Sequence, residues 1–131
     1  MLYVRKLSED ATIPTKSPDG SFLELYSAEE VHLDPREKKL IRTNLQLKVP
    51  RGTCGRITTL PNYFLTNGVD AGQTAIPRNF EGEVCVILSN HVDEVFTVYK
   101  GDKIAGLLCE KIMQPRMKVV NSIEYSANGK E

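Results

Sequence analysis

Apolar and polar residues alternate along much of the chain with the two-residue period of β-strands. In residues 44–50, Leu45, Leu47 and Val49 alternate with polar side chains, which predicts a strand with one apolar and one solvated face. Residues 83–89 form a nearly continuous apolar run. That run is short enough to be a strand that is buried on both faces.

Two further strands and frequent turns extend this pattern. Residues 95–99 are β-branched and aromatic, and residues 103–112 are largely apolar, as expected of strands. Only residues 27–30 and 61–65 are able to form a helical turn. Turn signals that contain Gly, Pro, Asn or Asp occur at residues 18–20, 34–35, 50–52, 67–68 and 101–102. Many short strands with frequent turns predict an all-β sandwich or barrel, and the length fits a single domain.

Composition and charge narrow the function classes. Seventeen basic and seventeen acidic residues cancel, so the chain has no electrostatic reason to bind nucleic acid. The N-terminus has no apolar run long enough for a signal peptide or a membrane span. Cys54, Cys85 and Cys109 are odd in number and widely spaced, which argues against a disulfide scaffold and a zinc site. We expect free thiols in an intracellular protein, cytoplasmic or nuclear, without nucleic-acid or membrane partners.

The residues by themselves offer few candidates for chemistry. His32 and His91 have no partner at metal-ligand spacing, so we interpret both as loop or edge residues. Glu81 and Glu83 would share one face of a strand, where they serve either acid–base chemistry or solvation, and solvation is favoured. No phosphate-binding loop or nucleophile motif is present. This reading predicts an all-β intracellular domain and no particular activity.

Six segments of the chain resemble the sequence motifs of a known family. They are residues 7–16, 25–28, 55–57, 80–84, 88–90 and 101–107. They resemble the opening and the first four motifs of the trimeric dUTPases. The resemblance implies a dUTPase-like β-clip, a distorted jelly-roll barrel, in residues 1–120. Residues 121–131 are then a polar C-terminal tail.

The third motif departs from the family pattern where its chemistry is expected. In the family, an Asp holds the attacking water as general base, and this chain has Pro77 at that position. Phe80 replaces a Tyr whose ring packs under the deoxyribose, so the ring is retained and the hydroxyl is lost. Thr74 replaces a hairpin glycine, and a β-branched residue tolerates a glycine-type backbone poorly. These changes predict a damaged uracil-binding hairpin.

The phosphate-binding positions depart from the pattern as well. Leu60 stands where the family has a cationic Arg, and Pro61 stands where a Ser hydroxyl meets phosphate. Gly106 replaces a Gln that hydrogen-bonds phosphate, and Glu24 replaces an Asp of the metal–triphosphate shell. Residues 123–131 also do not resemble the glycine-rich fifth motif of the family.

These departures predict a vestigial nucleotide site with no catalytic residue, no metal and no cofactor. The protein would then be an inactive homotrimer, of viral origin, that acts as a scaffold for an unidentified protein partner. It would be similar in kind to the dUTPase-derived early-region protein of adenoviruses. The apolar segment 117–120 would pack on an adjacent subunit. The alternative is a drifted, magnesium-dependent dUTP diphosphatase, or a sensor that binds dUTP or dUMP.

Overall fold

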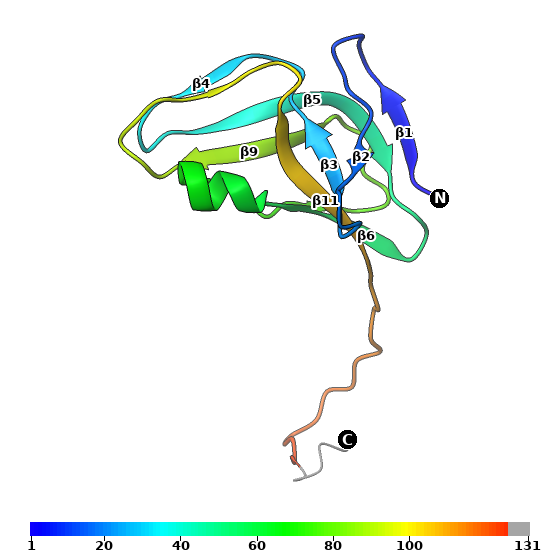
Figure 1. Ribbon diagram of the computed structural model, residues 1–131. Coiled ribbons are helices and arrows are strands. Elements are labelled where there is room, and N and C mark those ends of the chain that lie inside the picture. The colour runs from blue at the N-terminus through cyan, green and yellow to red at the C-terminus, as the bar shows by residue number, and fades with distance from the viewer. Residues whose placement is uncertain (126–131) are drawn as a thin grey trace.

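The structure is a computed structural model that describes residues 1–125, and its strands pair antiparallel in three sheets (Figure 1). In chain order the strands are β1 (Tyr3–Lys6), β2 (Thr15–Lys16), β3 (Leu23–Tyr26), β4 (Val31–Leu33), β5 (Lys38–Lys48), β6 (Thr53–Thr58), β7 (Val69–Ala71), β8 (Ala75–Ile76), β9 (Val84–Asn90), β10 (Phe96–Val98) and β11 (Lys103–Lys111). The all-β prediction is therefore confirmed for the described residues.

Two larger sheets form the body of the protein. The first has the strand order β1-β5-β9-β7, and the second has the order β2-β3-β11-β6-β8. Strands β4 and β10 pair as a separate two-stranded ribbon. The predicted strands at residues 83–89, 95–99 and 103–112 correspond to β9, β10 and β11. The predicted strand at 44–50 is the second half of the longer β5.

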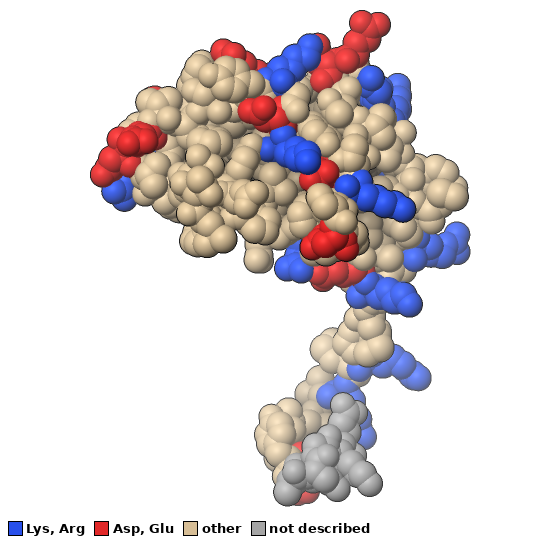
Figure 2. Space-filling view, viewed as in Figure 1, with Lys and Arg blue, Asp and Glu red and all other residues tan. Residues whose placement is uncertain are grey.

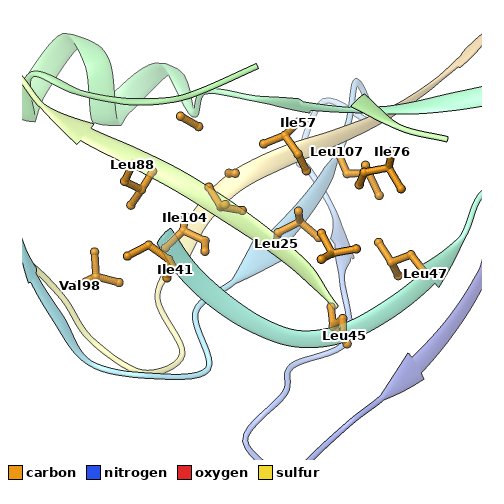
Figure 3. Packing of buried hydrophobic residues seen from close by; sticks show 14 of the residues in the cluster. Leu25, Ile41, Leu45, Leu47, Ile57, Ile76, Leu88, Val98, Ile104 and Leu107 are labelled. Atoms are coloured by element: carbon orange, nitrogen blue, oxygen red, sulfur yellow. The ribbon is translucent and has the colours of Figure 1, made fainter. Parts of the chain in front are cut away.

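The hydrophobic core lies between the inner faces of the two larger sheets (Figure 3). Leu45 and Leu47 of β5 are at most 1% exposed, as their alternation with polar residues predicts. Leu25 of β3 and Leu107 of β11 meet them from the second sheet and are equally buried. The core is aliphatic. Strands such as β5 and β9 present alternate residues to it, whereas β11 buries the adjacent residues Ile104 and Ala105 at a register shift.

A β-bulge bends β5 between its two pairing segments. Register is interrupted between Arg42 and Leu45, and Asn44 takes a left-handed conformation at φ +54°. Glu83 accepts hydrogen bonds from the Asn44 backbone N–H at 2.8 Å and from its side-chain amide at 2.9 Å. These bonds stabilise the bulge. Glu83 therefore has a structural role, beyond the solvent-exposed role that the sequence favoured.

Two sequence predictions about local structure are wrong. Residues 27–30 form a bend, because Ser27 N–H donates to Asp102 and Ala28 N–H donates to Arg42, both far along the chain. Strand β9 is not buried on both faces: Ile87 on its outer face is 37% exposed. Cys85 and Ser89 on the same face are half-buried, so that face is only partly covered.

The helical turn predicted at residues 61–65 is present, and it continues as the π-helix η1 (Tyr63–Asn67). All three cysteines are free thiols, and burial raises the pKa of Cys85 and Cys109. Within residues 1–125, no helix is long and apolar enough to cross a membrane. After β11 the chain runs away from the body as an extended, exposed segment (Figure 1). Of the predicted tail, residues 121–125 are exposed and 126–131 lie outside the described residues.

Candidate functional site

Two of the predicted site residues face each other on adjacent strands of the second sheet. Glu24 on β3 pairs with Gly106 on β11, and Gly106 pairs in turn with Thr58 on β6. Residues directly opposite each other in a sheet share one face. Glu24, Gly106 and Thr58 therefore form one continuous row on the face opposite the core.

Glu24 is a buried carboxylate with two partners. The residue is 7% exposed, and its carboxylate accepts a hydrogen bond from Thr15 Oγ1 at 2.8 Å and pairs with Lys103 Nζ at 3.0 Å. The Thr15 hydroxyl and Lys103 lower the pKa of Glu24, and the same carboxylate raises the pKa of Lys103. Glu24 is therefore ionised at neutral pH and held by a fixed cation.

Gly106 is required by its neighbours. A Cβ at this position would lie 2.8 Å from Phe22 Cδ2 and 2.8 Å from Thr58 Cγ2. The Phe22 ring therefore occupies the space where the family Gln would project. Sequence reasoning missed Phe22, because only the strand register shows that its ring lies over β11.

Leu60 and Pro61 open the helical segment that leads into η1. Leu60 is 8% exposed, and its carbonyl accepts the Tyr63 N–H at 3.0 Å, whereas Pro61 is exposed. The Tyr63 hydroxyl donates to the backbone carbonyl of Lys103, and burial together with the Asp102 charge raises the pKa of Tyr63 to about 12. This bond ties η1 to Lys103, the first residue of β11, whose side chain pairs with Glu24.

The prediction that Thr74 damages the hairpin is not supported by its backbone. Arg36 and Asn44 are the non-glycine residues with positive φ among those that the structure describes, so Thr74 has an ordinary conformation. Its carbonyl accepts the Ile57 N–H at 3.0 Å, which joins the hairpin to β6. The glycine is therefore not needed for a left-handed turn here.

Pro77 and Phe80 lie in a turn at a different edge of the molecule. The Pro77 carbonyl accepts the Phe80 N–H at 3.0 Å, and the Phe80 ring is partly exposed. This turn forms one wall of a groove of about 660 Å³, and its lining residues are Tyr3, Val4, Arg5, Gln46, Leu47, Lys48, Arg78, Asn79, Phe80 and Glu81. Of the predicted site residues, Glu24 and Gly106 thus lie together on the second sheet, Phe80 lines this groove, and Thr74 lines a separate pocket beside β6.

The remaining candidate residues have simpler surroundings. His32 Nδ1 contacts Thr97 Oγ1 at 3.0 Å, and His91 Nε2 contacts the Asp70 carboxylate at 3.1 Å. Both histidines are exposed. In the described part of the chain, no three His, Cys, Asp or Glu side chains lie close enough together to hold a metal ion.

Comparison with known proteins gives one consistent result. The sequence profile of the family described as dUTPase matches residues 9–131. The chain is 38% identical to a probable deoxyuridine 5'-triphosphate nucleotidohydrolase of Schizosaccharomyces pombe, over 97% of this chain and 91% of that protein. It is 34% identical to the Saccharomyces cerevisiae nucleotidohydrolase, over 98% of this chain and 89% of that protein.

A mammalian relative and solved structures agree with these matches. The Rattus norvegicus nucleotidohydrolase is 36% identical over 95% of this chain, which spans 61% of the rat protein. The dUTPase of Staphylococcus bacteriophage 80alpha, solved as a variant with dUpNHpp, has a TM-score of 0.90 at 22% identity, covering 100% of this chain and 95% of that one. The dUTPase-like barrel and its single-domain organisation are thereby confirmed.

These relatives contradict the prediction of a catalytically inactive scaffold. Chains that match this one along almost its whole length at 34–38% identity are named nucleotidohydrolases, and they come from cellular organisms, so viral origin gains no support. The prediction judged each position by the side chain that was lost.

We expect Gly106→Ala to lower the free energy of unfolding by about 1–3 kcal/mol, because the new Cβ must push Phe22 or Thr58 aside. Phe22→Ala in the same background should recover part of that loss, as measured by urea unfolding of the two single variants and the double variant. Gly72→Ala is the matched control, since its Cβ would meet nothing closer than 3.8 Å. Equal stability of the two alanine variants would contradict this account.

The Glu24–Lys103 pair predicts a pH dependence. Because folding lowers the pKa of Glu24 below its ordinary value of 4.5, the stability that it contributes is present above that pH and is lost as the pH falls further. The thermal midpoint of the wild type should therefore fall below pH 4.5 more steeply than that of Glu24→Gln. Glu94→Gln, at an exposed position, should behave as the wild type does. If the thermal midpoints of the wild type and Glu24→Gln fell equally with pH, the stabilising role of the Glu24–Lys103 pair would be refuted.

Proposed function

Since this chain belongs to the dUTPase family, we propose that it hydrolyses dUTP to dUMP and pyrophosphate. The observation that carries the proposal is the 38% identity to the probable nucleotidohydrolase of Schizosaccharomyces pombe, which extends over 97% of this chain and 91% of that protein. A match of that extent covers almost the whole chain. The reaction belongs to the alternative that the sequence left open.

We assign the nucleotide to the positions that the family resemblance marks. Phe80 presents a partly exposed ring that can pack under the deoxyribose, and Thr74 keeps its hairpin paired with β6. Leu60, Pro61 and Gly106 offer no cation, hydroxyl or amide to a phosphate. The charged groups that act on the triphosphate must therefore come from elsewhere in the chain.

The attacking water needs a base other than Pro77, whose side chain accepts no proton. Glu81 is our candidate, since it lines the same groove as Phe80. Its carboxylate is exposed and makes no hydrogen bond or ion pair with another side chain of residues 1–125. Glu83, by contrast, is held by Asn44 and Arg42. A free carboxylate beside the sugar-binding ring can take a proton from water.

The residues present do not fit a dedicated magnesium site. Glu24 is the carboxylate that the resemblance assigns to the metal–triphosphate shell, and it is already bound by Thr15 and Lys103. Within residues 1–125, Glu24 belongs to no group of three or more His, Cys, Asp or Glu side chains that could hold a metal ion. We therefore treat magnesium as part of the metal–nucleotide substrate and derive no step through it.

The proposed assembly is a homotrimer, and the segment after β11 supports it. Met117 and Val119 are 91% and 93% exposed on a segment that leaves the body of its own chain (Figure 1). Apolar side chains on such a segment gain free energy when another chain covers them. An exposed edge strand such as β1 is a ready partner for an extended segment. An intracellular location, consistent with three free thiols, completes the proposal.

We expect the protein to release pyrophosphate from dUTP with magnesium at a turnover on the order of 1–10³ s⁻¹, as ordinary enzymes do. Glu81→Gln should reduce kcat by about 10²–10⁴-fold, because it removes the proton acceptor and keeps the shape. Glu94→Gln, another exposed carboxylate, should leave kcat unchanged. No release by the wild type refutes the function, whereas full activity of Glu81→Gln refutes only the choice of base.

Light scattering at micromolar concentration should give a mass three times 14.7 kDa. Met117→Glu combined with Val119→Glu should shift the mass to that of one chain, because each change places a charge in the proposed contact. Lys118→Glu, on the same segment, changes the charge without removing an apolar side chain. This control should keep the mass of three chains. A wild-type mass of 14.7 kDa would rule out the trimer.

A further inference from the structure

The groove beside Phe80 carries more positive than negative charge, although the chain is neutral overall. Arg5, Lys48 and Arg78 line it, against the single carboxylate of Glu81. None of the three cations forms an ion pair with another side chain of residues 1–125. On the face shown in Figure 2, Lys and Arg side chains are most frequent toward the right, the side on which Figure 1 draws β1. The groove therefore favours an anionic occupant.

Strand pairing sets the spacing of the side chains on one wall of the groove. In the β1–β5 ladder, Tyr3 lies opposite Lys48 and Arg5 lies opposite Gln46, so these four side chains project to the same side. The residues between them project to the core side. The two outward pairs are thus two residues apart, or about 6.6 Å along the strand. An extended peptide repeats the side chains of one face at the same interval.

The turn that carries Phe80 contributes the rest of the groove. Gln46 Nε2 donates a hydrogen bond to the backbone carbonyl of Glu81, which ties this turn to β5. Arg78 and Asn79 stand on the turn and line the groove. The amide of Asn79 can both donate to and accept from a peptide backbone. The groove therefore offers partners for the main chain of an occupant as well as for its charges.

We propose that this groove docks an extended acidic segment of a partner protein, whose carboxylates at alternate residues meet Arg5, Lys48 and Arg78. Guanidinium groups pair with carboxylates through two parallel hydrogen bonds, which gives such contacts a defined geometry. Tyr and Arg are also the side chains that most often dominate binding at protein interfaces. Tyr3, which is 65% exposed, lies beside these cations in the groove.

Two other occupants fit the groove less well. The extended segment of a second copy, residues 112–125, carries Arg116 and Lys118 against the one carboxylate of Glu124. These cations would meet like charges in the groove, so that segment can lie at the β1 edge without filling the groove. A single-stranded nucleic acid also suits cations and aromatic rings. A neutral chain, however, lacks the overall positive charge that attracts a polyanion.

The docking itself does not depend on the proposed function. One consequence of it does, because Phe80 and Glu81 line the groove and are also assigned to the dUTP site. A peptide in the groove and dUTP should therefore exclude each other.

The test is fluorescence anisotropy of the full chain with three labelled peptides of equal length. Glu alternates with Thr along the first peptide, and Gln or Lys replaces Glu in the other two. The Glu peptide should bind the wild type at least about tenfold more tightly than the Gln peptide, because three exposed ion pairs together contribute about that factor. The Lys peptide should bind more weakly than either. Affinity for the Glu peptide should fall as the salt concentration rises.

The groove variant combines Arg5→Gln, Lys48→Gln and Arg78→Gln. It should bind the Glu and Gln peptides equally, and its affinity should no longer depend on salt. All three side chains are exposed, so the variant should keep the wild-type thermal midpoint.

The matched control variant carries Lys16→Gln, Lys38→Gln and Arg51→Gln. These changes remove three exposed cations that do not line the groove. The control should bind the Glu peptide as tightly as the wild type does.

Three results would overturn the docking site. The first is equal affinity of the wild type and the groove variant for the Glu peptide. The second is tighter binding of a labelled oligothymidylate than of the Glu peptide, lost in the groove variant, since the groove would then serve a nucleic acid. The third is a mass in light scattering that falls in the groove variant and not in the control, since a second copy would then fill the groove.

The outcomes also separate the docking site from the hydrolase. If the wild type releases no pyrophosphate from dUTP and yet binds the Glu peptide through the three cations, the docking site stands without the hydrolase. If the wild type is active and the groove variant binds the Glu peptide unchanged, the hydrolase stands without the docking site. When both hold, dUpNHpp should displace the labelled Glu peptide, and a failure to displace it would refute the mutual exclusion.

Discussion

The two larger sheets must cover each other's apolar faces, and the rest of the structure depends on that constraint. Leu25 and Leu107 from one sheet and Leu45 and Leu47 from the other become at most 1% exposed only when the sheets stack. A core of this kind is aliphatic and closely packed, and burial of that apolar surface is the main favourable contribution to folding. Figure 3 shows these core side chains packed between the sheets. Because side chains on a strand alternate, the same packing determines which residues face outward.

The outward faces carry the candidate chemistry. On the second sheet, Glu24 lies next to Leu25 in sequence and projects to the opposite side, where Thr15 and Lys103 hold it as a carboxylate. On the first sheet, Arg5 and Lys48 flank the core residues Val4 and Leu47 and project into a groove. Both sites are therefore consequences of core packing, which leaves every second residue free for another purpose.

The residues at single motif positions and the match to relatives along almost the whole chain point in different directions in this protein. Pro77, Leu60 and Gly106 lack the groups that the family resemblance assigns to their positions, and Phe22 occupies the space beside Gly106. The relatives that match almost the whole chain are nonetheless named nucleotidohydrolases. Arg5 and Lys48 of the β1–β5 face line the same groove as Phe80.

The sequence by itself determined the β-strand period, the turns and the family. Alternation at Leu45, Leu47 and Val49, turn residues such as Gly101, and the motif segments depend on neighbours in the chain, and such local signals can be read directly. It did not reveal that Ile87 faces outward, that residues 27–30 bend, or that Thr74 is unstrained. Only the tertiary structure decided these features, and it alone brought Phe22 over Gly106 and Arg5 beside Phe80. The physical reason is strand pairing: it joins residues far apart in the chain through backbone hydrogen bonds, and those bonds are the same for every residue type except proline.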